Sequence, residues 1–383
     1  MNWSRYKYIL NDITSYSKGF ASCSKNQLFK KNLINSFNKA NGDKAFCTVK
    51  KKQYPPWNVL FFGTDEFSVE TLKSLHKNQL EDKNRLVNKL EVVCNPGQSV
   101  IRQYAVQFNL KIHDWPVNIK KGKYDVGVLA SFGRLIPASV INSFQYGILN
   151  VHPSLLPQWR GSAPIIHTVL NGDKVTGISI MQLKPKKFDI GPVLFQKEVA
   201  VPYRITAVEL CNHLAVLGGE ILVNCLRDLP KLSKEEKQQD TSKATYAPKI
   251  TKWMGKLDWK NNTCIDIDRR YRAISSLIPV FTMWRNKKVK LRDMVDPNIT
   301  RDLLQANFKN LPVGSVRFYR KENILLIKCK DGLVGFRKIT YQNPMTAKDF
   351  FNGFISKTEQ KFSRPTSSYN IISCCTFLQV YQI

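Results

Sequence analysis

The sequence is poor in acidic residues and in long apolar runs. Its 383 residues include 29 Asp and Glu against 59 Lys and Arg, which gives a formal charge of +30. It has no run of 18 apolar residues, so no membrane-spanning helix is predicted. With 43% hydrophobic and 11% aromatic residues, the composition excludes a chain that is disordered throughout. At this length we expect two or three domains, each with its own core.

Several motifs that define common cofactor sites are also missing. Gly63 is not part of a GxGxxG dinucleotide motif, and no GxxxxGK[ST] phosphate loop occurs. The nine cysteines include no CxxC pair, and no histidine lies at zinc-finger spacing. We therefore interpret them as reduced thiols in a reducing compartment. These spacings do not exclude a metal site whose ligands lie far apart in the sequence.

The amino-terminal segment carries 11 basic and only 2 acidic residues over positions 1–52. It is rich in Lys, Ser and Asn and lacks the apolar stretch of a secretory signal, so we predict a mitochondrial presequence over residues 1–53. Arg5 is its only arginine, fewer than such leaders usually carry. The alternative is a disordered basic tail.

A second basic region lies near the carboxyl end. Residues 241–355 carry 23 basic and 9 acidic residues, and strand patterns occur at Ile324–Cys329 and Gly332–Arg337. Because Lys and Arg gain free energy by releasing counterions from phosphates, a small all-β domain with this charge indicates a polyanionic partner. The alternative is a surface whose charge serves solubility alone.

The middle of the chain alternates strand and helix patterns. This alternation predicts an open, mostly parallel sheet with helices on both faces. The polar stretch Leu232–Gly255 is predicted to be a linker. The predicted strands are Trp57–Phe62, Leu90–Cys94, Tyr124–Ala130, Gly147–His152, Val175–Leu183 and a segment near Val193–Phe195; the predicted helices are Glu66–His76, Val100–Phe108, Pro137–Phe144, Ala163–Leu170 and Thr206–Leu229.

Three polar residues could carry chemistry. The period of two in a strand places Asn150 and His152 on one face, at the strand end where open α/β sheets bind ligands. Asp189 lies between two extended segments, where flanking Phe188 and Ile190 predict partial burial. An amide donor, an imidazole and a carboxylate together could stabilise an oxyanion and move protons. The alternative for each is a structural role, as a satisfied histidine or a turn-forming aspartate.

The segments around these residues resemble a known family. Residues 150–157 (NVHPSLLP) followed by 159–164 (WRGSAP) resemble the signature of enzymes that use 10-formyltetrahydrofolate. Residues 59–64, 176–182, 188–191, 245–250 and 256–259 narrow the resemblance to the methionyl-tRNA formyltransferase family, and to its mitochondrial branch. The resemblance covers roughly residues 57–355.

The resemblance implies an α/β fold, with a Rossmann-like, mostly parallel sheet domain followed by a smaller β-barrel (OB-like) domain. It implies a catalytic domain at 54–235, a linker at 236–255, a tRNA-binding domain at 256–355 and a tail at 356–383. The catalytic residues would be Asn150, His152 and Asp189. The cofactor-binding residues for 10-formyltetrahydrofolate would be Ser154, Leu155, Leu156, Pro157, Phe132, Leu135 and Ile190, with no metal.

The implied partner is methionyl-tRNA, formylated for translation initiation in the mitochondrial matrix by a monomer that does not bind membranes. The short uncharged segment 94–99 replaces a basic loop of bacterial members, which puts strict selection of an initiator tRNA in doubt. The alternatives are an enzyme that uses formyltetrahydrofolate on a small molecule and a noncatalytic RNA-binding protein. The candidate tRNA contacts are Arg160, Lys243, Lys249, Lys252, Arg269, Arg270, Lys287 and Lys288.

Overall fold

The structure is a computed structural model that describes residues 51–185, 188–303 and 311–356. The predicted presequence, apart from its last residues, and the predicted tail beyond residue 356 lie outside the described residues. Within the described ranges no helix is both long enough and apolar enough to cross a bilayer.

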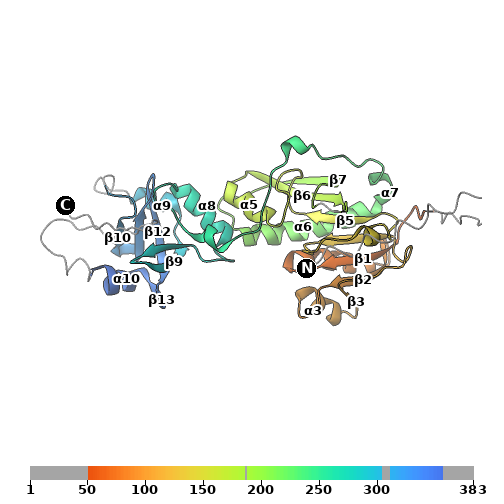
Figure 1. The fold of residues 1–383 in the computed structure, drawn as a ribbon, viewed down its shortest axis with the longest axis horizontal. Helices are drawn as coiled ribbons and strands as arrows, with labels where there is room; N and C mark the ends of the chain where they lie inside the picture. Colours follow the sequence, from red (N-terminus) through yellow and green to blue (C-terminus); the bar gives the residue numbers. More distant parts are fainter. Residues whose placement is uncertain (1–50, 186–187, 304–310, 357–383) are drawn as a thin grey trace, which may run out of the picture. The chain divides into compact units, whose positions relative to one another are not determined.

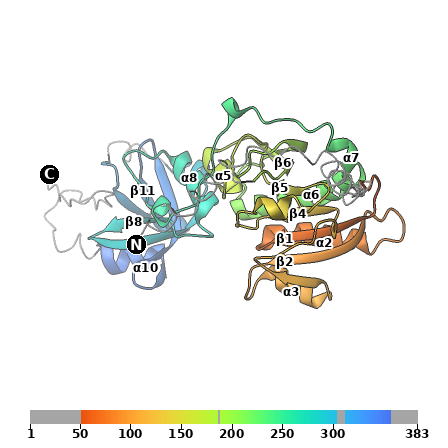
Figure 2. The ribbon, with the colours of Figure 1, turned by 45° about the vertical axis from the view of Figure 1, so that its right-hand side comes forward.

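The first domain is built on a seven-stranded sheet with the order β3-β2-β1-β4-β5-β6-β7. The first five of these strands run parallel, whereas β6 is antiparallel to both β5 and β7. This confirms the predicted mostly parallel sheet, which can be followed in Figure 1 and Figure 2. The strands are β1 (Trp57–Gly63), β2 (Val87–Cys94), β3 (Lys111–Asp114), β4 (Val126–Ala130), β5 (Ile148–His152), β6 (Val175–Gln182) and β7 (Val193–Ala200).

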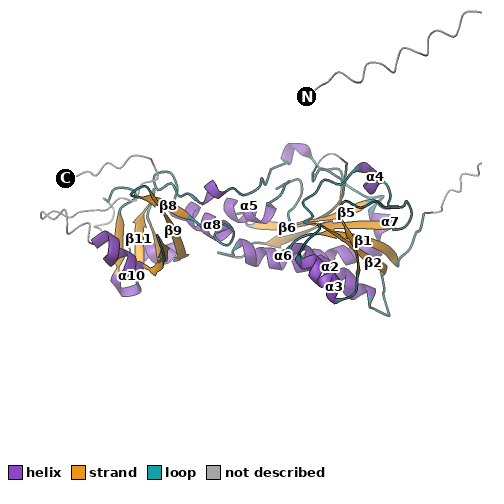
Figure 3. Ribbon diagram, turned by 60° about the horizontal axis from the view of Figure 1, so that its bottom comes forward, coloured by secondary structure: helices purple, strands orange, loops and turns teal. Residues whose placement is uncertain are grey.

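Helices lie on both faces of this sheet, with α2, α3 and α6 on one face and the short α4 on the other (Figure 3). Alternate residues of the buried strands therefore enter two separate cores. In β5, Leu149 and Val151 enter the larger core, whereas Ile148 enters the smaller one. The helices of this domain are α2 (Glu66–Gln79), α3 (Val100–Gln107), α4 (Ala138–Ile141), α5 (Pro164–Asn171), α6 (Ala207–Arg227) and α7 (Leu229–Leu232).

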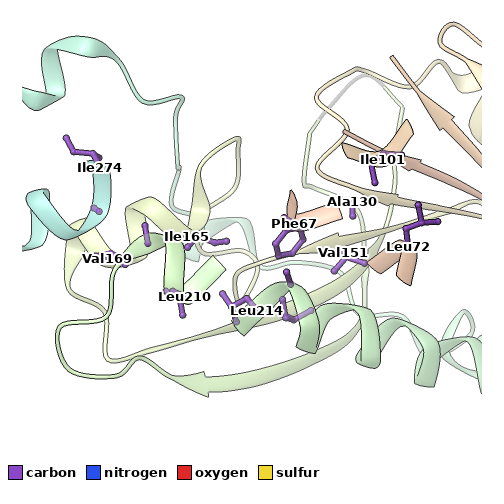
Figure 4. Close-up of a cluster of buried hydrophobic side chains, with 14 of the residues drawn as sticks. Phe67, Leu72, Ile101, Ala130, Val151, Ile165, Val169, Leu210, Leu214 and Ile274 are labelled. Carbon is purple, nitrogen blue, oxygen red and sulfur yellow. The ribbon is translucent and has the colours of Figure 1, made fainter. Parts of the chain in front are cut away.

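The larger core joins the sheet to α2 and α6. Phe67 of α2, Val151 of β5 and Leu214 of α6 approach one another in this core (Figure 4). Both helices begin with a capping box, in which Asp65 and Ser68 or Thr206 and Glu209 bond reciprocally. Such caps satisfy amide groups that the first helical turn leaves unpaired, and each stabilises a helix by about 1 kcal/mol.

The element boundaries differ from the sequence prediction in a few places. The strand β2 begins at Val87, three residues before its predicted start, and α4 ends at Ile141, three residues before its predicted end. The strand β3 was not predicted, because its four residues are exposed or partly exposed and a single apolar residue, Ile112, gives no pattern.

The second domain is an antiparallel sheet of six strands. Its order is β10-β11-β12-β9-β8, and β13 pairs with β12, which confirms the predicted strand-rich second domain. The hairpin of β8 and β9 turns at Arg285 and Asn286, both in the left-handed region that two-residue hairpin turns require. The elements are α8 (Cys264–Ile274), β8 (Phe281–Trp284), β9 (Lys287–Met294), α9 (Pro297–Asp302), β10 (Val316–Tyr319), β11 (Ile324–Lys328), β12 (Leu333–Thr340), β13 (Pro344–Thr346) and α10 (Ala347–Phe350).

A buried carboxylate ties together strands at the edge of the first sheet. Glu91 of β2 is 2% exposed and pairs with Lys89 Nζ at 2.7 Å and with His113 Nε2 of β3 at 2.6 Å. The hydroxyl of Tyr124 also donates to it. Burial alone raises the pKa of Glu91, but hydrogen bonds from Lys89, Tyr124 and His113 outweigh burial and lower the pKa from 4.5 to about 2.

This lowered pKa predicts an acid-dependent loss of stability. Glu91 stabilises the fold above pH 4.5, and that contribution of about 3 kcal/mol is lost as the pH falls from about 4.5 to about 2. We expect Glu91→Gln to be less stable than the wild type at pH 7 and to lose less further stability on acidification. Urea unfolding at a series of pH values measures this, with Glu220→Gln, at an exposed position on α6, as the control. Parallel pH profiles for Glu91→Gln and the wild type would contradict the prediction.

Candidate active site

Asn150 and His152 lie at the carboxyl end of β5, between β4 and β6. The two side chains share the face of the sheet opposite Leu149 and Val151, as the strand period predicted. Asn150 is 6% exposed and His152 is 4% exposed, so the surrounding protein excludes most water from both. Buried polar groups of this kind need partners close by.

The partner of both side chains is Asp189, which lies in the turn between β6 and β7. Its carboxylate accepts a hydrogen bond from Asn150 Nδ2 at 3.3 Å and lies 3.7 Å from His152 Nδ1. Its second oxygen accepts the Gly161 N–H at 3.0 Å. The structure thus brings together the three residues that the sequence singled out. The predicted partial burial of Asp189 is confirmed at 9% exposure, although Phe188 does not cover it, because its own side chain is 61% exposed.

The backbone of Asp189 has a left-handed conformation, with φ of 53°. Aspartate tolerates this region better than most residues, but it persists only where surrounding contacts hold it. Gly191 follows in the same turn, and a β-carbon there would lie 1.7 Å from the Gln182 carbonyl oxygen. Only glycine therefore lets the turn close against β6.

The imidazole of His152 faces an oxygen atom at each nitrogen. Its Nε2 lies 3.0 Å from the Trp159 carbonyl oxygen, which can only accept, so Nε2 carries the proton. In the neutral ring, Nδ1 would then present a lone pair toward the Asp189 carboxylate. In the protonated ring, the Nδ1–H would instead point toward that carboxylate.

Side chains of the antiparallel strands β6 and β7 hold the loop that follows β5. Ser179 Oγ donates to the Ser154 carbonyl at 2.6 Å and accepts the Leu156 N–H at 3.0 Å. Gln196 Nε2 donates to the Leu156 carbonyl at 2.9 Å and to Ser179 Oγ at 2.8 Å. The peptide bond between Leu156 and Pro157 is cis. The hydrogen bonds from Ser179 and Gln196 hold the loop beside His152.

Gln239 supports the site and was missed in the sequence. Its Nε2 donates to the carbonyl oxygens of Asp189 at 3.0 Å and Gly191 at 2.7 Å. Its Oε1 accepts from Arg160 Nε at 2.9 Å and Nη2 at 2.7 Å. One amide therefore links the aspartate turn to the loop after β5. Nothing in the sequence distinguishes it from the other polar residues of the predicted linker.

The segment after Gln239 is bonded to the same loop. The Arg160 N–H donates to the Thr245 carbonyl at 2.9 Å, and the Ala247 N–H donates to the Arg160 carbonyl at 2.8 Å. A β-carbon at Gly161 would lie 2.7 Å from the Ala247 carbonyl oxygen. The part of the predicted linker around Thr245 and Ala247 therefore forms one wall of the site.

The predicted cofactor contacts lie in different surroundings. Ser154 and Leu156 are buried, and the Ser154 hydroxyl donates to the Gln158 carbonyl at 2.6 Å. Leu135 is 49% exposed, whereas Phe132 is 1% exposed and belongs to the smaller core. Phe132 therefore offers almost no side-chain surface to a ligand. Leu155, Pro157 and Ile190 are partly exposed.

The candidate tRNA contacts divide into exposed side chains and side chains that are held by other groups of the protein. Arg160 is 5% exposed with its guanidinium on Gln239, so it presents little surface to RNA. The guanidinium groups of Arg269 and Arg270 donate to the carbonyls of Asn171 and Lys256. The exposed members of the set are Lys243, Lys249, Lys252, Lys287 and Lys288.

Like charges gather around Lys288. Its ammonium group lies 3.7 Å from the centre of the Phe281 ring. Burial, followed by repulsion from Lys290 and Lys252, lowers the pKa of Lys288. A bound polyanion would relieve this repulsion. We therefore define Lys252 of the predicted linker, together with Lys288 and Lys290 of β9, as the basic cluster.

Comparison with known proteins places this geometry in a class. The formyl transferase family model matches residues 57–226, and the formyl transferase C-terminal domain model matches residues 249–355. An N-formyltransferase from Helicobacter canadensis, solved with folinic acid and dTDP-3-aminofucose, has the same fold, with a TM-score of 0.52 and 15% identity over 73% of this chain and 98% of that one. The two family matches show that the chain is a formyl transferase.

Relatives with higher sequence identity to this chain show to which family of formyl transferases it belongs. The mitochondrial methionyl-tRNA formyltransferase of Homo sapiens is 45% identical over 323 residues, which are 83% of this chain and 82% of that one. The methionyl-tRNA formyltransferase of Nitratidesulfovibrio vulgaris strain DP4 is 32% identical over 79% of this chain and 95% of its own. The chain belongs to the methionyl-tRNA formyltransferase family.

The role of Gln239 can be tested by truncation. We expect Gln239→Ala to lower kcat for formyl transfer by about tenfold to 100-fold, because small displacements of catalytic groups cost factors of this size. The variant should keep its KM for the formyl donor within about twofold. Steady-state kinetics measure this, and the exposed neighbour in Gln238→Ala is the control. Equal kcat values for the two variants would show that Gln239 does not position the turn.

Proposed function

We propose that this protein transfers the formyl group of 10-formyltetrahydrofolate to the α-amine of methionyl-tRNA. The formylated product would serve translation initiation in the mitochondrial matrix. The similarity to mitochondrial methionyl-tRNA formyltransferases supports the substrates and the compartment. The convergence of the Asn150 amide, the His152 imidazole and the Asp189 carboxylate within one buried cluster is the observation that carries the chemical part.

The reaction begins with the free amine of methionine attacking the formyl carbon. The carbonyl oxygen becomes negative as the tetrahedral centre forms. Asn150 Nδ2 and protonated His152 would donate hydrogen bonds to that oxygen. Their burial strengthens this stabilisation, because little water screens the developing charge.

Collapse of the tetrahedral centre requires a proton at the departing folate nitrogen. The 3.7 Å separation between His152 Nδ1 and the Asp189 carboxylate leaves this nitrogen without a direct hydrogen bond to the carboxylate. Asp189, directly or through a water molecule, would orient His152 and help to pass the amine proton to the leaving nitrogen. Because an amine nitrogen can leave once protonated, we propose that the transfer itself uses no metal ion.

The folate would bind along the loop after β5. Ser154 to Pro157 are fixed by Ser179 and Gln196, so the backbone of the loop can form one side of a pterin site without rearranging. Leu135 and Ile190 would add apolar surface beside it. For Phe132 we propose only support of this wall from inside the smaller core.

The second domain, together with the connecting segment before it, would bind the tRNA. We propose a catalytic domain over 54–235, a connecting segment over 236–255 and a tRNA-binding domain over 256–355, acting as a monomer. The exposed Lys243, Lys249, Lys252, Lys287 and Lys288 would contact phosphates. A formyl transferase for small molecules would not need the net charge of +14 that residues 241–355 carry.

Loss of Asn150 tests the proposed chemistry. We expect Asn150→Ala to lower the rate of formyl transfer to methionyl-tRNA by about 100-fold to 1000-fold, because an oxyanion donor is lost. The assay incubates the purified protein with 10-formyltetrahydrofolate and methionyl-tRNA and measures the formylmethionine released by mild hydrolysis. His213→Ala, at an exposed position on α6, is the control. No product on any tRNA with the wild type would refute the proposed function.

The basic cluster predicts how tRNA binding depends on salt. Plots of log binding constant against log salt concentration should become shallower by about 1 for Lys252→Ala and for Lys288→Ala, because each removes one phosphate contact. Filter binding between 50 and 300 mM salt measures this. Lys77→Ala, at an exposed position on α2, should keep the wild-type slope. Unchanged slopes in all three variants would place the RNA elsewhere.

A further inference from the structure

Two cysteines far apart in the sequence meet in the second domain. Cys264 is the first residue of α8, and Cys329 follows β11, 65 positions later. Their sulfur atoms lie 3.3 Å apart. Asp331, in the turn that joins β11 to β12, presents its carboxylate to the same point, with Cys329 Sγ 3.6 Å from its Oδ1.

The three ligand atoms are close enough to share one ion. The two sulfurs and a carboxylate oxygen all lie within 4.8 Å of one another. A zinc ion binds sulfur at about 2.3 Å and carboxylate oxygen at about 2.0–2.2 Å, so two atoms that share it lie at most about 4.6 Å apart. Small rotations of these side chains therefore suffice to place all three around a single ion.

The backbone around these residues is shaped to hold them. The Cys264 N–H donates to Asp331 Oδ1 at 2.8 Å, and the Cys329 N–H donates to the Gly332 carbonyl at 2.9 Å. A β-carbon at Gly332 would lie 2.8 Å from Cys264 Sγ, so glycine leaves the space that this sulfur occupies. The turn thus fixes the aspartate and both sulfurs relative to one another.

The charges and exposures also suit a cation. Two thiols and a carboxylate converge, and within the described part of the chain Asp331 has no ion pair with a basic side chain. Cys329 is buried, Cys264 is partly exposed and Asp331 is exposed, so an ion can reach the site from solvent. The open side leaves a fourth position for water. Thiolates select soft or borderline metal ions such as zinc rather than magnesium or calcium.

We propose that Cys264, Cys329 and Asp331 bind one zinc ion, with water as the fourth ligand. The ion would fasten the first turn of α8 to the turn between β11 and β12. Because none of these residues belongs to the cluster around Asp189, the inference does not depend on the proposed function. It is the kind of site that spacing in the sequence cannot show, since its ligands come from separate elements.

The test uses the full chain, stripped of metal with a chelator under reducing conditions and then dialysed against zinc ions. Inductively coupled plasma mass spectrometry should find about one zinc ion per chain in the wild type. Cys264→Ser and Cys329→Ser should lose it. Cys211→Ser, at a partly exposed cysteine on α6, should keep it.

The variant Asp331→Asn tests whether zinc is lost because a ligand is missing or because the protein fails to fold. The side chain is exposed, and asparagine can still accept the Cys264 N–H, but it is a much poorer zinc ligand. We expect its zinc affinity to fall at least about tenfold, and zinc to raise the melting temperature of the wild type and of Cys211→Ser more than that of Asp331→Asn. Gly332→Ala should also weaken binding, because its methyl group displaces the Cys264 sulfur.

Three results would overturn the proposal. The first is a wild type that retains no more zinc than Cys264→Ser. The second is equal zinc affinity in Asp331→Asn and the wild type, which would remove the aspartate from the ligand set. The third is a Cys264–Cys329 disulfide that forms and persists in the presence of zinc, seen as a mass loss of about 2 Da under non-reducing conditions, which would make the pair a redox couple.

Discussion

The site depends on one buried carboxylate. Removing a charge such as that of Asp189 from water is costly unless donors surround it. Here the donors are the Gly161 backbone amide and the Asn150 side chain, with His152 within reach. The same contacts that satisfy the aspartate therefore fix the relative positions of the amide and the imidazole. The left-handed turn, the glycines and Gln239 all serve to hold this carboxylate in place.

The pattern of residues predicted much of this arrangement. The strand period placed Asn150 and His152 on one face, and the alternation of strand and helix patterns predicted a mostly parallel sheet. Asp189 could be singled out because it lies in a turn between two extended segments. These are local signals, which depend on residues within a few positions of one another.

The remaining features depend on contacts between distant residues. Gln239 lies 50 positions from Asp189, in a polar stretch where each glutamine looks like any other. Arg160 was predicted to contact RNA because of its charge, yet its guanidinium is buried on Gln239. The pairing of Cys264 with Cys329 spans 65 positions. Composition and periodicity cannot reveal such contacts, because only the folded backbone brings these residues together.

The connecting segment has a consequence for how the two domains communicate. The N–H of Arg160 donates to the Thr245 carbonyl, and the Arg160 carbonyl accepts the Ala247 N–H. The next residue, Gly161, donates its N–H to the Asp189 carboxylate. A displacement of this segment would therefore be transmitted to the carboxylate through one peptide unit. A ligand of the second domain that shifted this segment would therefore also shift the Asp189 carboxylate. Ligand binding by the second domain and the geometry of the site would thus depend on the same connecting segment.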